Sequence, residues 1–423
     1  MEEKYELYLI TNDFPFGQSE ASFILPELPY LKQYFHITII SCSLSEVQTT
    51  CVDEDIDIIH YNRKASIFRK LLDCINLLGE IETYIELWNI ITSGSKIGRR
   101  IFESVLFGEE SKRFERFLKD NKIFKKNAPS LIYCYWFDFY CLTMTRIFKK
   151  DCSVKIVTRA HRYDLYDDAR ISGWQPYKQQ MDHRLNSVIF ISEHGRQYYL
   201  KRYCKLADED KYPLFRLGVS KPKHEVSIKA EHPPFLLVSC SLVIPRKRVN
   251  LIVRALSEIR DDKIHWVHFG NGEEFDKLKE MSHQLLDVKN NISYELKGYV
   301  EADQIMEYYE KHYVDAFITT TASEGCPVSV QEAMACGIPI IGTKVAEIPY
   351  MIKGNGILLS ENPDENDIAR AIHDMYILND EKKMKMRAQS KQLWEQEFDV
   401  RKNASCFSRE IYYKCTKPSM EKE

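Results

Sequence analysis

Residues 322–339 read ASEGCPVSVQEAMACGIP, and this stretch decides how the second half of the chain folds. The apolar run AFITT precedes it at residues 316–320, and the run PIIG follows at residues 339–342. Pro327 suits the start of a helix, where its missing N–H costs nothing, and Gly337 suits the residue just past the helix end. The pattern predicts a helix that begins at the carboxyl edge of a parallel sheet.

The same alternation of short apolar strands and helices runs along the whole chain. It predicts strands at residues 5–11, 36–41, 131–135, 154–158 and 187–191, and a second series at residues 235–239, 264–269, 292–296, 316–320 and 339–342. A helix is predicted at residues 22–34, after the first strand. The predicted fold class is α/β, with two Rossmann-like domains facing a central cleft. We assign residues 1–219 to an amino-terminal domain, 220–234 to a proline-punctuated linker, 235–398 to a second domain and 399–423 to a tail.

The composition suits a chain with two cores, since 44% of the 423 residues are hydrophobic and 29% are charged. Lys and Arg number 59 against 62 Asp and Glu, and this net charge of -3 argues against a nucleic-acid partner. The start, MEEKY, lacks the features of a signal peptide, so we expect a cytoplasmic protein. The 12 cysteines form no C-x-x-C pair, which predicts reduced thiols and no metal site.

Two glutamates flank the start of the predicted helix at residues 322–339. Glu324 lies in the loop before the helix, and Glu332 lies inside the helix. At this spacing they cannot form one tight acid/base or metal pair. They suit two hydroxyl-bearing groups of an elongated ligand, with an anion held between them by the free N–H groups of the helix start.

A basic run follows the first strand of the second domain. Arg246, Lys247 and Arg248 lie in the loop after the strand at residues 235–239. Fixed cations at the end of a strand suit an anion such as a diphosphate, which the start of the predicted helix also suits. We take Lys247 as the first candidate for this role and Arg246 as the second.

The segment from Glu324 to Pro339 resembles the E-x7-E signature of retaining glycosyltransferases of family four, which have two Rossmann-like domains (the GT-B fold). Further blocks agree in order: residues 14–17 with Glu20, 158–161, 216–219, 245–249 and 270–272. The resemblance implies that Glu324 contacts the donor sugar and Glu332 the nucleoside ribose. Where the family often has an arginine, this chain reads CSLV at residues 240–243, so Arg246 or Arg248 is expected to compensate.

The resemblance makes residues 1–219 the acceptor-side domain and residues 235–398 the nucleotide-sugar-binding domain. It also implies roles for residues in the first domain. His161 follows the strand at residues 154–158 and is expected to hydrogen-bond the transferring sugar, with Asp164 as a candidate to orient it. The catalytic candidates are therefore Glu324, His161, Lys247 and Arg246. The donor-binding candidates are Gly17, Gly325, Cys326, Val328, Ser329 and Glu332.

The resemblance implies a metal-independent enzyme without a cofactor that moves a hexose unit, with retention, from a nucleoside-diphosphate sugar to a glycan or lipid-linked saccharide in surface-polysaccharide synthesis. The sequence leaves open a covalent glycosyl-enzyme and a front-face displacement. It also leaves open an epimerase, a phosphorylase or a non-catalytic relative on the same scaffold. A metal-dependent transferase would need an Asp-x-Asp motif, and we interpret residues 53–57 and 208–210 as solvated surface instead.

Residues 61–127 contain 14 Lys and Arg but 9 Asp and Glu, with aromatic residues among them. We favour helices packed on the sheet. The alternative is an amphipathic region that rests on anionic lipid at the inner face of the membrane, which would favour a lipid-linked acceptor.

Overall fold

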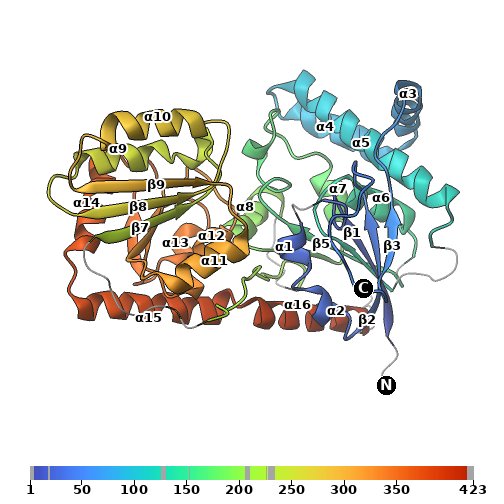
Figure 1. Cartoon of the computed structure of the whole chain (residues 1–423). Helices are drawn as coiled ribbons and strands as arrows, with labels where there is room; N and C mark the ends of the chain where they lie inside the picture. Colours follow the sequence, from blue (N-terminus) through green and yellow to red (C-terminus); the bar gives the residue numbers. More distant parts are fainter. Residues whose placement is uncertain are drawn as a thin grey trace. The chain divides into compact units, whose positions relative to one another are not determined.

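The computed structural model describes residues 4–17, 20–124, 130–151, 153–204, 210–224, 226 and 234–416. It divides into unit 1, Met1–Arg216 with Ala404–Glu423, and unit 2, Leu217–Asn403. Each unit is built on one six-stranded parallel sheet (Figure 1). The predicted fold class, α/β with two Rossmann-like sheets, is confirmed.

The sheet of unit 1 has the strand order β3-β2-β1-β4-β5-β6. Side chains on successive residues of a strand point to opposite faces, so Leu7 and Leu9 join one apolar cluster while Tyr8 and Ile10 join another. Both faces are therefore covered by helices, as a parallel sheet requires. The strands are β1 (Tyr5–Thr11), β2 (Phe35–Ser41), β3 (Asp57–His60), β4 (Leu131–Cys134), β5 (Lys155–Ala160) and β6 (Ser187–Phe190).

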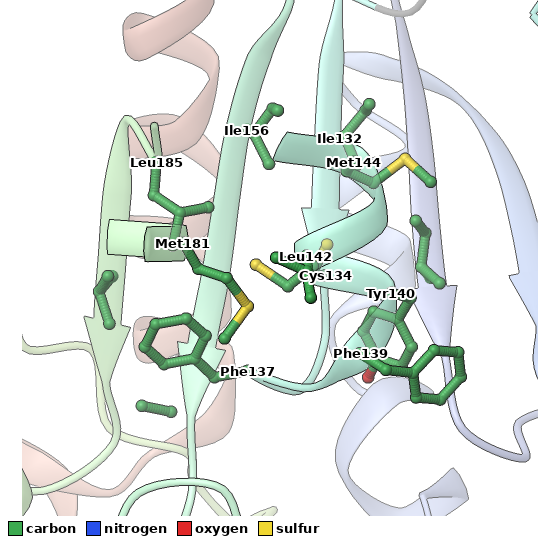
Figure 2. Packing of buried hydrophobic residues seen from close by; sticks show 14 of the residues in the cluster. Ile132, Cys134, Phe137, Phe139, Tyr140, Leu142, Met144, Ile156, Met181 and Leu185 are labelled. Atoms are coloured by element: carbon green, nitrogen blue, oxygen red, sulfur yellow. The ribbon is translucent and has the colours of Figure 1, made fainter. Parts of the chain in front are cut away.

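One face of this sheet is covered by α5 (Ile97–Asp120), α6 (Phe139–Ile147) and α7 (Lys178–Asp182). Figure 2 shows part of this core, with Leu142 and Met144 of α6 and Met181 of α7 in one cluster with side chains of β4 and β5. The remaining helical elements are α3 (Ile67–Asn76), η1 (Leu77–Gly79), α4 (Ile81–Thr92), η2 (Asp167–Ala169) and α8 (Glu193–Tyr203).

The other face is covered by α1 (Ala21–Ile24), α2 (Leu28–Leu31) and the last helix of the chain, α16 (Val400–Thr416). Phe407 and Ile411 of α16 are fully buried in this cluster. Residues 399–416 of the predicted tail are therefore part of the fold, because α16 supplies core residues to unit 1. Residues 417–423 lie outside the described residues.

The sheet of unit 2 has the order β12-β11-β10-β7-β8-β9. The chain starts in the middle at β7, builds outward to β9, and then builds the other half from β10. This is the same doubly wound order as in unit 1. The strands are β7 (Phe235–Cys240), β8 (Ile264–Phe269), β9 (Ile292–Gly298), β10 (Ala316–Thr319), β11 (Ile340–Thr343) and β12 (Gly356–Leu359).

Helices cover this sheet too. Apolar side chains of α9 (Asn250–Glu258), α10 (Phe275–Leu286) and α14 (Glu365–Tyr376) form a core with alternate residues of β7 and β8. The other helices are α12 (Val328–Ala335), which packs on α15 (Asp380–Glu397), with η3 (Pro245–Lys247), α11 (Ala302–Lys311) and α13 (Ile348–Met351).

All ten predicted strands are present, but the structure corrects other predictions. The helix predicted from residue 22 to 34 is two short turns, α1 and α2, because Pro26 interrupts it. The edge strands β3 and β12 were not predicted. Residues 225 and 227–233 of the predicted linker lie outside the described residues, as do residues 208 and 209 of the acidic run at 208–210.

Candidate active site

The strand order of unit 2 gathers the predicted residues at one point of the sheet edge. β7 and β10 are neighbours, and the loops after them continue to opposite halves of the sheet. In open α/β sheets, ligands bind at such a switch point, outside the carboxyl ends of the strands. The loop after β7 carries Arg246 and Lys247, and the loop after β10 carries Glu324.

Hydrogen bonds hold these two loops together. The N–H of Ala322 donates to the carbonyl oxygen of Arg246 at 2.8 Å. The Arg248 guanidinium donates to the carbonyl oxygens of Thr320 and Thr321 at 2.7 and 2.9 Å. It also reaches Glu361 O at 3.0 Å and Asn362 Oδ1 at 3.1 Å. The structure thus gives Arg248 the role of a loop anchor, which differs from its expected role as a substitute phosphate ligand.

Glu324 is buried among cations. Its Oε1 accepts a hydrogen bond from Lys247 Nζ, and its Oε2 lies 3.7 Å from Arg246 Nη1. The Arg246 guanidinium also donates to the carbonyl oxygen of Ser323 at 2.5 Å. The structure therefore brings Arg246, Lys247 and Glu324 into one charged cluster. The hydrogen bond between Lys247 and Glu324 is charge-assisted, since both groups are ionised.

Glu332 has a different environment. It lies inside α12, half-buried, and forms no ion pair among the described residues. Desolvation raises its pKa from 4.5 to about 7. A carboxyl group that is desolvated without a cation is poised to accept hydrogen bonds from a ligand, because ligand hydroxyls would replace the hydrogen bonds that water no longer supplies.

The helix start between these glutamates is formed as predicted, with a shift of one residue. Pro327 is the N-cap, α12 begins at Val328, and Gly337 adopts a left-handed φ of 67° after the helix end. The first N–H groups of a helix have no intrahelical acceptor, so those of Val328 and Ser329 suit an anion. Cys326 is buried and accepts a hydrogen bond from Gln331 Nε2 at 3.2 Å, so its side chain is turned inward.

A third loop completes this edge. Gly270 has a φ of 136°, and a Cβ atom there would lie 1.8 Å from the carbonyl oxygen of Ser241. The N–H of Val243 donates to the carbonyl oxygen of Asn271 at 3.0 Å. The glycine therefore lets the loop after β8 lie directly against the loop that carries the basic residues.

The equivalent edge of unit 1 is organised around Glu20, which is buried. Its carboxylate accepts hydrogen bonds from the N–H groups of Asn12, Asp13 and Phe14 at 3.1, 2.7 and 2.8 Å. It also accepts one from Trp136 Nε1. Glu20 thus joins the loops after β1 and β4, the switch point of this sheet, and desolvation raises its pKa to about 7.

Gly17 lies in the loop that Glu20 holds. Its N–H donates to the carbonyl oxygen of Asp13 at 2.7 Å, and a Cβ atom at this position would lie 2.2 Å from Asp13 Oδ2. The tight turn at the end of β1 therefore excludes a larger side chain unless Asp13 moves.

His161 lies after β5, at the same edge of unit 1. Its ring packs against Trp136 at an interplanar angle of 38°, with centroids 4.2 Å apart, and neither ring nitrogen has a hydrogen-bond partner among the described residues. Asp164 accepts the backbone N–H of His161 at 2.6 Å and that of Phe137 at 2.7 Å. Asp164 therefore fixes the backbone around His161, and its Oδ2 lies 3.8 Å from His161 Nδ1.

Trp136 was not singled out from the sequence, and Arg248 was expected to substitute for a missing arginine rather than to anchor loops. Trp136 links Glu20 to His161, and its position directly after the predicted strand at 131–135 was the available signal. The anchoring role of Arg248 had no sequence signal, because it depends on carbonyl groups that are distant in the chain. In the described ranges, no three His, Cys, Asp or Glu side chains lie close enough to hold a metal ion.

The second half of the chain resembles a known protein family. Residues 220–393 match the family model described as Glycosyl transferases group 1. The matched residues all lie in unit 2. All of Arg246, Lys247, Glu324 and Glu332 lie within the matched residues of this domain.

Curated relatives share this domain. The GtfA subunit of a UDP-N-acetylglucosamine–peptide N-acetylglucosaminyltransferase from Streptococcus pneumoniae is 30% identical over 121 residues, which are 28% of this chain and 22% of that protein. WcaL of Escherichia coli, assigned as a glycosyltransferase of colanic acid biosynthesis, is 24% identical over 219 residues, or 49% of this chain and 52% of that protein. The chain thus spans about half the length of this relative.

Solved structures match the whole fold. The lipopolysaccharide outer core galactosyltransferase WaaB has a TM-score of 0.69 at 16% identity and covers 97% of this chain and 99% of its own. HepE of Anabaena, solved with UDP and glucose, has a TM-score of 0.63 at 13% identity and covers 97% and 100%. These likenesses show that the group 1 domain is part of a GT-B fold.

Proposed function

We propose that the protein is a retaining glycosyltransferase that moves a hexose from a nucleoside-diphosphate sugar to a glycan or lipid-linked saccharide in surface-polysaccharide synthesis. The observation that carries the proposal is the charged cluster of Arg246, Lys247 and Glu324 at the switch point of unit 2. WcaL and WaaB, which are named for polysaccharide and lipopolysaccharide synthesis, support the acceptor class.

Different residues of unit 2 bind different parts of the donor. In this proposal, Lys247 and Arg246 neutralise the diphosphate while Glu324 accepts hydrogen bonds from the sugar, and Glu332 accepts those of the ribose. As the bond between the sugar and the diphosphate breaks, its electron pair goes to the phosphate oxygen, where the cations stabilise the new charge. In the front-face alternative, the acceptor oxygen bonds to the sugar carbon on the side that the diphosphate leaves, and its proton passes to the departing phosphate oxygen.

UDP is the first nucleotide to test, because HepE was solved with UDP and GtfA is named for a UDP-sugar donor. The proposal includes a cytoplasmic location and no resident cofactor or metal. The eleven cysteines that the structure describes are all free thiols, which suits a reducing compartment.

The test is release of nucleoside diphosphate from UDP-, GDP- and ADP-sugars by the full chain, with and without a saccharide acceptor. We expect turnover with one donor class, and a loss of about 100-fold or more in kcat for Glu324→Gln and Lys247→Ala, since each removes a charge at the leaving group or sugar. Lys277→Ala, an exposed lysine of α10, is the control and should keep full activity.

Three further measurements separate the alternatives. Turnover that survives EDTA supports the metal-independent reaction. A product whose anomeric configuration is the same as that of the donor sugar supports retention. Formation of an epimerised donor without release of nucleoside diphosphate would indicate an epimerase and not a transferase. Donor binding without any turnover, unchanged by Glu324→Gln, would indicate a non-catalytic relative.

A further inference from the structure

The apolar side of α3 is turned away from the protein. Positions i, i+1, i+4, i+5 and i+8 of a helix lie on one side, and here they carry large apolar side chains. Ile67 and Phe68 are 79% and 71% exposed. The side that faces α5 is polar instead, since Asp73 is buried and forms an ion pair with Arg116 of α5. The exposed apolar residues of α3 are Ile67, Phe68, Leu71, Leu72 and Ile75.

The next helix, α4, has the same inverted arrangement. Its buried side holds Glu82, which pairs with Arg184 at 2.6 Å, and Glu86, which accepts hydrogen bonds from Ser104 and Trp174. Its exposed side is apolar at i, i+3, i+4, i+7 and i+10, the spacing of one helix face. These exposed residues are Ile81, Tyr84, Ile85, Trp88 and Ile91.

Both helices lie against α5 and form the outer layer of this part of unit 1 (Figure 1). Leu77 of η1 fixes the connection between them, because it is buried against Gly108 of α5, where a Cβ atom would lie 2.9 Å from it. Apolar residues on an ordinary protein surface are scattered. Contiguous exposed apolar stripes on two consecutive helices instead indicate a site of contact with a protein or a membrane. We call these two stripes the apolar face.

Within residues 64–106 the exposed charged side chains are all cations, although the exposed Asp120 of α5 lines a hollow together with Asn76 of α3. Between residues 64 and 106 no Asp or Glu is exposed, because all five carboxylates are buried or half-buried. By contrast, Arg69, Lys70, Lys96 and Arg99 are exposed, and none forms an ion pair with another described residue. A surface of apolar side chains and unpaired cations is complementary to an anionic lipid interface, where headgroups meet the cations and acyl chains meet the apolar side chains.

We propose that the apolar face, with Arg69, Lys70, Lys96 and Arg99, docks the protein on an anionic membrane surface. The aromatic rings of Phe68, Tyr84 and Trp88 suit the headgroup level. Among the described residues no helix is long and apolar enough to cross a bilayer, so the contact is interfacial. Within the segment at residues 61–127, α5 packs apolar side chains on the sheet, whereas the exposed sides of α3 and α4 suit the lipid alternative.

The test is sedimentation of the full chain with vesicles of phosphatidylcholine alone or mixed with phosphatidylglycerol. We expect binding to the anionic vesicles only, and weaker binding as salt is raised. Phe68→Ser with Trp88→Ser should weaken binding about tenfold or more, because both side chains lose their apolar contact. Arg69→Glu with Lys70→Glu should weaken it by a similar factor.

Matched controls use equally exposed residues of unit 2. Val288→Ser and Lys277→Glu should bind vesicles as the unaltered protein does, and Glu324→Gln should bind them although it lacks turnover. Melting temperatures check that the altered proteins are folded. The proposal does not depend on the transferase reaction, so inactivity and failure to bind lipid are separate results.

Two outcomes would overturn the proposal. One is failure of the unaltered chain to bind either vesicle, or binding that the changes in the apolar face leave intact. The other is a concentration-dependent dimer that Phe68→Ser and Trp88→Ser abolish in the absence of lipid, which would make the apolar face an interface between copies of this chain.

Discussion

The two glutamates of the predicted motif differ in what surrounds them. Glu324 is neutralised by Lys247 and Arg246, whereas Glu332 has no cation partner among the described residues and is desolvated. A raised carboxyl pKa means that the folded protein favours the protonated form. The stability from this group is full below about pH 4.5 and is lost as the pH rises to about 7.

This difference predicts a pH dependence of donor binding. An ionised Glu332 accepts hydrogen bonds from two ribose hydroxyls more strongly than a protonated one, so kcat/KM for the donor should rise as the pH increases through about 7. Glu332→Gln should lower kcat/KM and remove this rise, while kcat at saturating donor changes less. Initial rates over a pH series provide the measurement.

Glu280→Gln, on the exposed side of α10, is the control and should keep the profile of the unaltered protein. A Glu332→Gln protein that retained the rise through neutral pH would contradict the assignment, since another group would then be responsible.

At the scale of elements, the site depends on how the loops after β7 and β10 are held. Arg248 has a left-handed φ of 53°, which is uncommon outside glycine, and donates to three carbonyl groups of two other loops. The position of Glu324 therefore depends on a guanidinium that does not itself contact this carboxylate in the structure.

We predict that Arg248→Ala raises the donor KM about tenfold or more and lowers the free energy of unfolding by about 1–3 kcal/mol, because buried carbonyl groups lose their donors. Arg248→Lys should not restore the KM, since an ammonium group lacks the fork geometry. Kinetics and urea unfolding measure the two effects.

Arg248→Gly separates the backbone from the side chain, because glycine adopts the left-handed conformation without strain. It should unfold at a higher urea concentration than Arg248→Ala but show the same rise in KM. Arg254→Ala, on the exposed side of α9, is the control. A normal KM for Arg248→Ala would show that the loops keep their positions without this anchor.

Most central elements were predictable from local pattern. β1 and β8 are mostly buried apolar runs bounded by turn residues, and both match their predicted ranges. The short edge strands β3 and β12 escaped prediction because each has four residues with mixed exposure, so their pairing rather than their pattern defines them. The helix predicted at 22–34 is interrupted at Pro26, because proline lacks the N–H group that a continuous helix needs.

At the scale of the whole molecule, the end of the chain is part of the core of unit 1. The Arg159 guanidinium is buried in an ion pair with Glu27, and it lies over the Phe407 ring at 4.3 Å from the centroid. Phe407 also contacts Tyr133, with ring centroids 5.3 Å apart. One helix from the end of the sequence therefore encloses a buried charge pair of the first half.

We predict that Phe407→Ala lowers the free energy of unfolding of unit 1 by about 3–5 kcal/mol, because it leaves a cavity beside a buried ion pair. Tyr413→Ala, a half-exposed residue of the same helix, should cost less than about 1 kcal/mol. Scanning calorimetry with and without UDP provides the measurement, since a ligand of unit 2 stabilises the unit that binds it.

An effect of Phe407→Ala no larger than that of Tyr413→Ala would mean that α16 contributes little to the core. A transition raised by UDP that also moved by the full amount in Phe407→Ala would show that the two units unfold together.

The sequence by itself determined the α/β class, the two strand series and the helix between Glu324 and Pro339, because apolar periodicity, Pro327 and Gly337 act within a few residues of the chain. It also placed Lys247 and Glu324 at strand ends. Only the tertiary structure decided which of these residues meet, since the switch point brings together loops that are distant in sequence. It alone made Arg248 an anchor, Trp136 a link and α16 a core helix, and it turned the apolar sides of α3 and α4 outward, because a helix pattern gives the composition of each side but not its direction.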